Sequence, residues 1–390
     1  MATSPILDPG AERLGRSAPR LPAPGVFRLD PILLLAVIGL GVCSIVAIDA
    51  TTQASLASRQ GVYFAGGLVL VLLVSQIDYS RLRELKYGVY GFMIASIVAV
   101  LALGSVTRGS RRSIELGFMQ LQTSELGKVL LCLALAAFLV DRSRRLGERD
   151  TTARAMLLTL FPAALVMIQP DLGSALVYLV IVMAALFCAG TSWRHFVGLF
   201  ALGAAAIAIA LVGAPRLGVE VLHEYQVERL TSFLQPSDNA SDAGYQQKQS
   251  VIAIGSGERT GRGEEATQTS LKFLPEEHTD FVFAVVGERW GFVGAALVLS
   301  LYALLIWRAL RILTMAKNLY GAVIAGGIVA MILFQVFVNV GMNIGIMPIT
   351  GIPLPLMSYG GSSVLTTLLA VGLLQSIHVQ ARASRKGLLN

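Results

Sequence analysis

Charged residues are scarce in this 390-residue chain, of which only 14% are Asp, Glu, Lys or Arg. Because a soluble globular domain carries about 25% charged residues, this shortage excludes that class. The three cysteines each lie inside an apolar run, which excludes a disulfide framework. The four histidines are scattered and the acidic residues lack ligand spacing, so the sequence predicts no metal centre.

Apolar residues make up 55% of the chain and fall into runs of about 17 to 25 residues, the length that crosses a hydrocarbon core of about 30 Å. The sequence therefore predicts an all-α integral membrane protein with ten transmembrane helices. Pro170 and its polar neighbours separate the fifth helix from the sixth. The predicted spans are 31–50, 61–77, 87–106, 124–140, 155–168, 172–190, 195–213, 280–307, 319–343 and 361–380.

Lysine and arginine concentrate in alternate loops, which places both termini in the cytoplasm. This orientation accounts for the net charge of +7, so we expect no nucleic-acid partner. Residues 1–28 read as a disordered basic cytoplasmic tail, 29–381 as one membrane domain and 382–390 as a short cytoplasmic tail.

The segment 214–279 forms a large extracytoplasmic loop between the seventh and eighth helices, and it is too long to be structureless. The sequence predicts a short helix over residues 243–254, with its apolar side resting on the membrane surface. The glycines between 255 and 263 predict a flexible turn after it.

A charged side chain costs about 2.5 to 3.5 kcal/mol at the bilayer centre, so each charge inside a span needs a partner or a function. Several such side chains lie at the outer ends of the apolar spans. Glu125 and Lys128 have opposite charges and share one helical face, which predicts an internal ion pair. Asp171 begins the sixth span as a helix cap or as a functional carboxylate. Arg112 lies in an outer loop against the positive-inside tendency, which predicts an anionic partner such as a headgroup phosphate.

Asp280 follows His278 and Thr279 where the eighth span enters the membrane. A carboxylate at this boundary suits a general base of raised pKa, and the alternative is an N-cap. Ser358 and Tyr359 belong to residues 339–363, where three prolines and several glycines predict a broken backbone that shapes a site.

Six segments together resemble the SEDS family (shape, elongation, division and sporulation), bacterial cell-wall proteins with ten transmembrane helices. The resemblance covers about residues 30 to 380, and within the family the chain looks more like the elongation members than the division members. The segments are GSRRSIELGFMQLQTSELGK at 109–128, QPDLGSAL at 169–176, YQVERLTSFLQP at 225–236, GYQQKQSVIAIGSG at 244–257, FLPEEHTDFVFAVVGE at 273–288 and NVGMNIGIMPITGIPLPLMSYGGSS at 339–363.

The resemblance implies a peptidoglycan glycosyltransferase that polymerises lipid II on the outer face of the cytoplasmic membrane. The family's essential aspartate falls on Asp280, and Arg112, Lys128 and Arg229 match basic positions that would stabilise a diphosphate leaving group. Any Mg²⁺ or Mn²⁺ would arrive with that diphosphate. The resemblance also implies the growing lipid-linked glycan as a second substrate, and a class B penicillin-binding protein and the elongation machinery as partners. Further residues expected to bind substrate or order the site are Glu125, Asp171, His278, Ser358 and Tyr359.

The chain departs from the family pattern near the expected site. Ser113 stands in place of a tryptophan, Thr123 in place of a proline, and Arg289 and Trp290 in place of an acidic residue and a leucine. Two other functions stay open: a lipid II flippase, and a non-catalytic scaffold for cell-wall enzymes. A flippase needs polar residues through the membrane depth, whereas here they gather at the outer ends.

Overall fold

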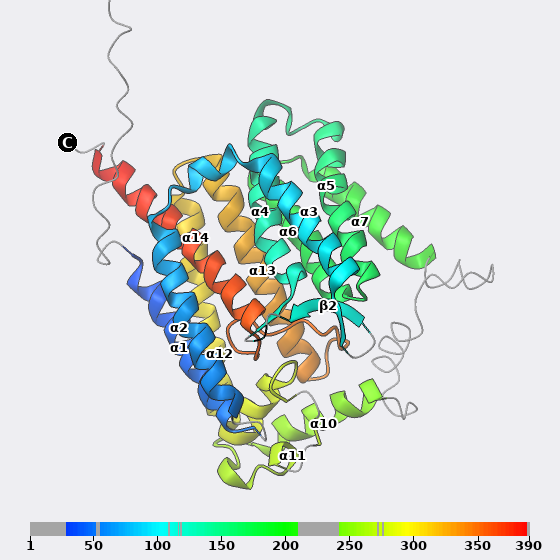
Figure 1. Ribbon diagram of the computed structural model, residues 1–390, viewed down its shortest axis with the longest axis vertical. Helices are drawn as coiled ribbons and strands as arrows, with labels where there is room; N and C mark the ends of the chain where they lie inside the picture. Colours follow the sequence, from blue (N-terminus) through cyan, green and yellow to red (C-terminus); the bar gives the residue numbers. More distant parts are fainter. Residues whose placement is uncertain are drawn as a thin grey trace, which may run out of the picture.

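Long α-helices dominate the computed structural model, which describes residues 29–51, 55–107, 110–115, 117, 119–209, 242–270, 273–274 and 277–387 (Figure 1). Nine of the helices described are long and apolar enough to cross a membrane, so the chain is a multi-pass membrane protein. They are α1 (Pro31–Asp49), α2 (Ser55–Gln76), α3 (Lys86–Leu103), α4 (Thr123–Asp141), α5 (Arg149–Ile168), α6 (Leu172–Ala189), α12 (Val282–Met315), α13 (Leu319–Asn343) and α14 (Gly361–Gly387). A further apolar helix, α7 (Trp193–Ala208), has 16 residues.

Three helices form the interior of the bundle. The apolar spans of α4, α13 and α14 are 78%, 72% and 83% buried, whereas that of α3 is only 17% buried. Helix α2 packs along α14, α6 along α13 and α1 along α12 (Figure 1). The polar residues at the ends of α4, α13 and α14 are therefore held by the most enclosed part of the fold.

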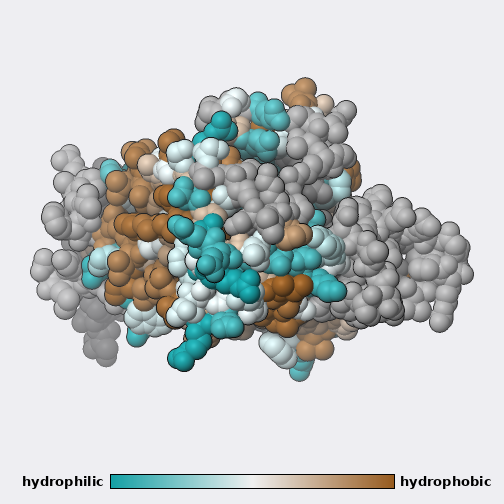
Figure 2. All heavy atoms as spheres, turned by 90° about the horizontal axis from the view of Figure 1, so that it is seen from below, coloured by the Kyte–Doolittle hydropathy of each residue, from teal (hydrophilic) through white to brown (hydrophobic). Residues whose placement is uncertain are grey.

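The two ends of the bundle differ in charge. The end that contains Asp280, called here the Asp280 end, carries the short elements α10 (Asp242–Ser256) and α11 (Thr267–Ser270). Seen from this end, hydrophilic residues gather across the middle of the surface and an apolar area lies at its flank (Figure 2). The opposite end, called here the Asp30 end, carries the connections between α2 and α3 and between α4 and α5, which are rich in arginine.

Several element predictions need correction. Residues 104–122 contain a small antiparallel sheet of β1 (Ser105–Thr107), β2 (Ser110–Glu115) and β3 (Gln120–Leu121), so the fold is not purely α-helical. Helix α14 runs to Gly387, so residues 382–387 are helical. Helix α5 begins at Arg149, earlier than predicted, and its charged first turn contains Asp150, which pairs with Arg142 and Arg154.

Helix α10 confirms the helix predicted over 243–254, but one of its faces packs against protein. Gln247 Nε2 donates a hydrogen bond to the Met347 carbonyl at 2.8 Å, and Ser250 Oγ donates to the Asn343 carbonyl at 2.9 Å. Ala253 is fully buried on the same face. This face of α10 is therefore fixed to the Asp280 end of α13.

Helix α12 is interrupted at Gly291, whose backbone lies at φ 62° and ψ −155°. The break leaves the amides of Phe292 and Val293 without helical partners, and they donate to the carbonyls of Glu258 and Arg259 at 2.9 and 3.1 Å. The loop 257–263 therefore completes the hydrogen bonding of the break. The short part of α12, residues 282–290, is called here the Asp280 half-helix.

The glycine-rich loop after α10 begins with the predicted turn, and two of its glycines are packed tightly against α12. A Cβ atom on Gly257 would lie 1.9 Å from the Gly287 carbonyl oxygen. Gly261 has φ +85°, and a Cβ there would lie 2.1 Å from the Arg289 carbonyl oxygen. These glycines permit two backbones to touch, which is a tertiary requirement.

At the Asp30 end, a buried polar cluster joins the beginning of α1 to α12 and α14. Asp30 caps α1 by accepting from Ile32 N and Leu33 N, each at 3.1 Å, and its carboxylate pairs with the Arg308 guanidinium at 2.5 Å. Gln375 Oε1 accepts from Asp30 N at 2.8 Å. Burial opposes ionisation of Asp30, but the hydrogen bonds from Arg308 and the Leu33 amide and the nearby positive charges together outweigh it, so the pKa lies below its ordinary value.

Replacing Asp30 with Ala is expected to destabilise the protein by about 2 to 3 kcal/mol, because it removes a cap and leaves Arg308 without its carboxylate. The stability that the lowered pKa of Asp30 supplies is present above the unfolded pKa and is lost as the pH falls through the folded pKa. Thermal unfolding in detergent measures both effects. Asp150→Ala is the control, because the Asp150 side chain is 51% exposed and its ion pairs contribute little; an equal loss in both variants would contradict the expectation.

Candidate functional site

Asp280 lies in a turn over residues 277–280 that leads into α12. The N-cap of α12 is Phe281, so the alternative in which Asp280 caps the helix is not what the structure shows. Phe281 is fully buried in a small apolar cluster with Ala253, Ala284 and Met342. Asp280 itself is half-buried and directly follows Thr279 and precedes this anchored residue.

Three successive carbonyl groups of this turn accept hydrogen bonds from the C-terminal part of the chain. Tyr359 N donates to the His278 carbonyl at 2.8 Å, and Ser358 Oγ donates to the Thr279 carbonyl at 2.6 Å. The Asp280 carbonyl accepts from the amides of Asn339 and Asn343, each at 3.1 Å. The predicted residues Ser358, Tyr359 and His278 are therefore brought together with Asp280.

Sequence reasoning missed Asn339 and Asn343. The sequence does contain a pattern that could have identified them. They are two side-chain amides four residues apart near the end of an apolar span, where a polar side chain needs a hydrogen-bond partner. Aromatic rings add to the contact between the Asp280 turn and residues 358–359. The ring centroids of His278 and Tyr359 are 5.9 Å apart in an edge-to-face arrangement, and the ring centroid of Tyr63 in α2 is 6.2 Å from that of Tyr359.

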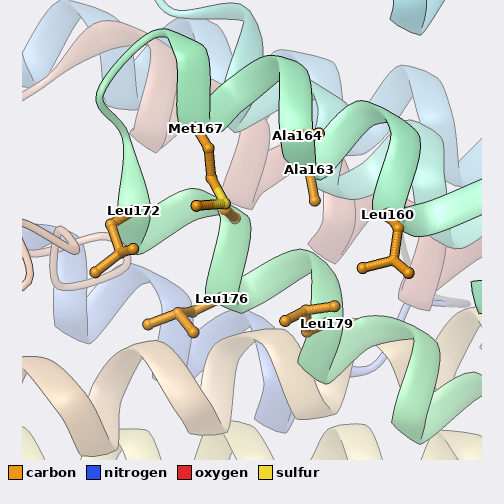
Figure 3. Close-up of a pocket in the computed structure, with 8 residues that line it drawn as sticks. Leu160, Ala163, Ala164, Met167, Leu172, Leu176 and Leu179 are labelled. Atoms are coloured by element: carbon orange, nitrogen blue, oxygen red, sulfur yellow. The ribbon is translucent and has the colours of Figure 1, made fainter. Parts of the chain in front are cut away.

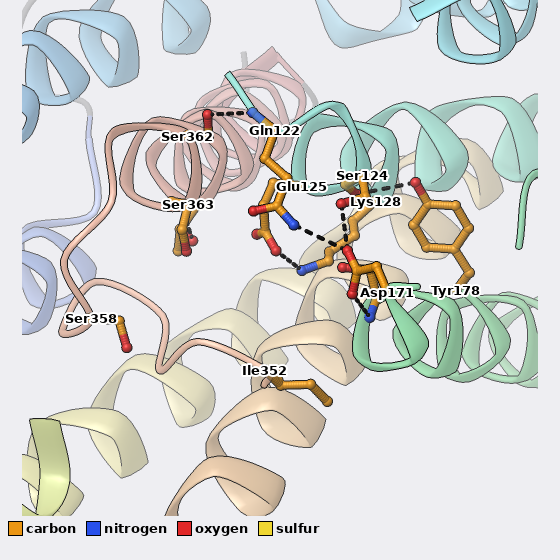
Figure 4. Close-up of polar contacts among 12 residues, drawn as sticks. Gln122, Ser124, Glu125, Lys128, Asp171, Tyr178, Ile352, Ser358, Ser362 and Ser363 are labelled. Carbon is orange, nitrogen blue, oxygen red and sulfur yellow. Dashed lines mark hydrogen bonds and ion pairs between the residues drawn. The ribbon is translucent and has the colours of Figure 1, made fainter. Parts of the chain in front are cut away.

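A second polar cluster surrounds Asp171 at the beginning of α6 (Figure 4). The Asp171 carboxylate accepts from Ser174 N at 3.0 Å, which confirms the predicted helix cap. It also accepts from Ser124 Oγ at 2.8 Å and from Gln122 Nε2 at 3.1 Å. Asp171 therefore caps α6 and also joins the beginning of α6 to the beginning of α4.

Glu125 and Lys128 form the predicted ion pair, with Lys128 Nζ 2.5 Å from Glu125 Oε1. The two residues are only 3% and 1% exposed. Both side chains point from α4 toward the Ser358–Ser363 segment (Figure 4). Because two buried opposite charges offset each other's desolvation, the geometry favours a role in ordering the site.

The Ser358–Ser362 segment connects the two clusters. At one end Ser358 holds the Asp280 turn, and at the other Ser362 Oγ accepts from Gln122 N at 2.9 Å and donates to the Gln120 carbonyl at 2.6 Å. Gln60 of α2 donates to the Ser358 carbonyl at 3.1 Å. These five residues therefore link the beginning of α4 to the Asp280 turn by hydrogen bonds at both ends.

The remaining predicted positions are described only in part. Arg112 lies in β2, and its side chain is outside the described part of the structure, as is the whole of Arg229. Among the positions that depart from the family pattern, Ser113 and Thr123 are buried, and Arg289 donates to the Ala50 carbonyl at 2.7 Å. The described residues hold no group of three or more His, Cys, Asp and Glu side chains that could bind a metal ion.

An apolar groove between α5 and α6 has a volume of about 250 Å³ (Figure 3). Its lining is hydrophobic throughout, so it offers no group for acid–base chemistry. Its lining residues are Leu160, Ala163, Ala164, Met167, Leu172, Ala175, Leu176 and Leu179.

The fold and the site define a multi-pass membrane protein with a half-buried carboxylate fixed at the polar end of its helix bundle. The family model for the cell cycle proteins FtsW, RodA and SpoVE matches residues 27–383. This chain belongs to that family, which is the SEDS family.

Individual relatives agree with the family assignment. The peptidoglycan glycosyltransferase MrdB of Escherichia coli K12 is 37% identical over 363 residues, which cover 92% of this chain and 95% of that protein. The peptidoglycan glycosyltransferase RodA of Treponema pallidum is 35% identical, covering 91% and 99% of the two chains. A probable peptidoglycan glycosyltransferase FtsW of Thioalkalivibrio sulfidiphilus is 37% identical, covering 90% of each.

Two solved structures share the fold. A chain from a study of polymerization and crosslinking by a peptidoglycan synthase complex superposes with a TM-score of 0.78, at 35% identity and with 90% of this chain and 98% of that chain covered. The rod shape determining protein RodA of Thermus thermophilus gives a TM-score of 0.66 at 32% identity, with coverage of 91% and 98%.

Proposed function

We propose that this protein is a peptidoglycan glycosyltransferase that polymerises lipid II during cell elongation, with Asp280 as general base. The observation that carries this proposal is the fixed turn that presents the half-buried Asp280 at the end of the bundle opposite the arginine-rich loops. The names of the MrdB and RodA relatives support the reaction class.

The proposed orientation follows from charge. Loops rich in lysine and arginine stay in the cytoplasm, so the Asp30 end faces inward and the Asp280 end faces the outer side of the bacterial cytoplasmic membrane. Helix α7 then serves as the tenth transmembrane helix, and both termini are cytoplasmic. The headgroups of lipid-linked substrates would lie at the level of Asp280.

In the proposed reaction, Asp280 accepts the proton of the 4-hydroxyl group of an acceptor N-acetylglucosamine. The freed oxygen attacks C1 of the donor N-acetylmuramic acid with inversion, and the bond from C1 to the diphosphate oxygen breaks. The lipid diphosphate leaves with the electron pair as an anion, so it needs positive charge nearby and no second carboxylic acid. Arg112 and Arg229 are the proposed cations, and the Glu125–Lys128 pair orders the site.

A class B penicillin-binding protein is the proposed partner. The structural neighbour from the peptidoglycan synthase complex, whose study concerns both polymerization and crosslinking, supports a crosslinking partner. Two reactions carried by one complex would deliver new strands directly to the crosslinking enzyme.

One observation favours the flippase as a second candidate, because interrupted helices such as α12 are frequent in transporters. Polymerisation of purified lipid II in detergent, with the partner present, distinguishes the two functions. A detergent micelle has no two sides between which lipid II could be moved, so strand synthesis there requires polymerase activity. Glycan strands are expected from the wild-type protein. Absence of strands, together with lipid II transfer across vesicles, would favour the flippase.

A further inference from the structure

Asn339 and Asn343 occupy successive turns of α13, and neither is exposed. A buried amide inside an apolar helix is unfavourable unless its polar atoms are hydrogen-bonded. Here both amides turn toward the Asp280 end of α12, so their hydrogen bonds account for their presence in this apolar span.

Together the two amides hold the chain at Asp280 and at one turn after it. Each donates to the Asp280 carbonyl at 3.1 Å, which occupies both lone pairs of that oxygen. The Asn343 side-chain oxygen accepts from Ala284 N at 3.1 Å. One side chain thus bonds to the backbone at 280 and again at 284, across the first turn of α12.

The amides are themselves held by other elements, so they act as fixed points. Asn339 also donates to the Ile352 carbonyl at 2.9 Å, and Asn343 donates to the Asn339 carbonyl at 2.8 Å. Ser250 of α10 donates to the Asn343 carbonyl at 2.9 Å. The position of the Asp280 carbonyl, and with it the backbone from which the Asp280 side chain projects, is therefore held by α13.

We propose that Asn339 and Asn343 are positioning residues that orient Asp280 for proton transfer, acting through its backbone carbonyl and without touching substrate. This inference rests on the proposed role of Asp280 as general base. Positioning of a catalytic group affects the chemical step, because an error of about 1 Å can lower a rate by about 100-fold.

The test compares Asn339→Ala and Asn343→Ala with wild type in the full-length protein bound to its crosslinking partner, using purified lipid II as substrate. We expect kcat to fall by about 10-fold or more in each variant while KM stays within about twofold, because the groups that bind lipid II are unchanged. Gln335→Ala is the matched control: Gln335 lies one turn before Asn339 on α13 and is only 2% exposed. Its kcat is expected to equal that of wild type.

Asn343→Leu is a second variant of similar size, in case an alanine variant does not fold. It fills the same buried space without a charge and removes the donor to the Asp280 carbonyl, while Ala284 N keeps its bond to the Phe281 carbonyl at 2.9 Å, so its kcat should fall as in Asn343→Ala. Wild-type kcat in folded Asn339 and Asn343 variants, or an equal fall in Gln335→Ala, would overturn the inference. Asp280→Asn, measured alongside, separates the two claims: its full activity would overturn the proposed function and this inference with it, and its inactivity leaves the asparagine result to decide.

Discussion

Asp280→Asn is expected to lower lipid II polymerisation by about 10²- to 10⁴-fold, the usual contribution of a general base. The substitution preserves the size of the side chain and removes its ability to take a proton. The backbone contacts of the turn run through carbonyl groups, which the substitution leaves in place. The folded structure and the binding of lipid II should therefore persist while strand synthesis stops.

Glycan strands separated by length provide the measurement, at matched protein concentration and matched melting temperature. Asp78→Asn is the control, because Asp78 caps η2 (Tyr79–Arg83) near the Asp30 end through a 2.9 Å bond from Ser80 N. Its activity should match wild type. Strands produced at the wild-type rate by Asp280→Asn would remove this residue as the base.

Lys128→Met is expected to destabilise the protein by about 3 to 5 kcal/mol and to abolish activity, because it leaves the buried Glu125 without its cation. Such a loss does not by itself show whether Lys128 touches substrate. The charge-reversed pair, Glu125→Lys with Lys128→Glu, makes that distinction because it restores a buried pair of opposite charges at the same spacing.

Because Lys128 is 1% exposed and paired, we expect the reversed pair to recover most of the melting temperature and most of the polymerase activity. The relevant measurements are thermal unfolding and strand synthesis on the same preparations. Recovery of folding without recovery of activity would instead place the Lys128 ammonium on the substrate.

Features that depend on local spacing were predictable from the sequence. The bounds of α13 match the predicted span 319–343, and α10 matches its predicted helix within two residues. The Glu125–Lys128 pair and the Asp171 cap follow from spacings of three residues along a helix. Each of these depends on residues that are near one another in the sequence, so no tertiary information was required.

Features that join distant parts of the chain were not predictable in this way. The bonds from Asn343 to residues 280 and 284 connect positions about 60 residues apart. The interruption at Gly291 depends on loop 257–263, which supplies carbonyl groups to the broken helix. The small sheet in residues 105–121 depends on pairing between three very short strands.

The interruption at Gly291 also has a mechanical consequence. The two parts of α12 take separate directions at this kink. The Asp280 half-helix is hydrogen-bonded to α13 and precedes a break that loop 257–263 completes, so these neighbours fix its direction. The placement of Asp280 therefore depends on α13 and this loop, and not on a straight continuation of the long part of α12.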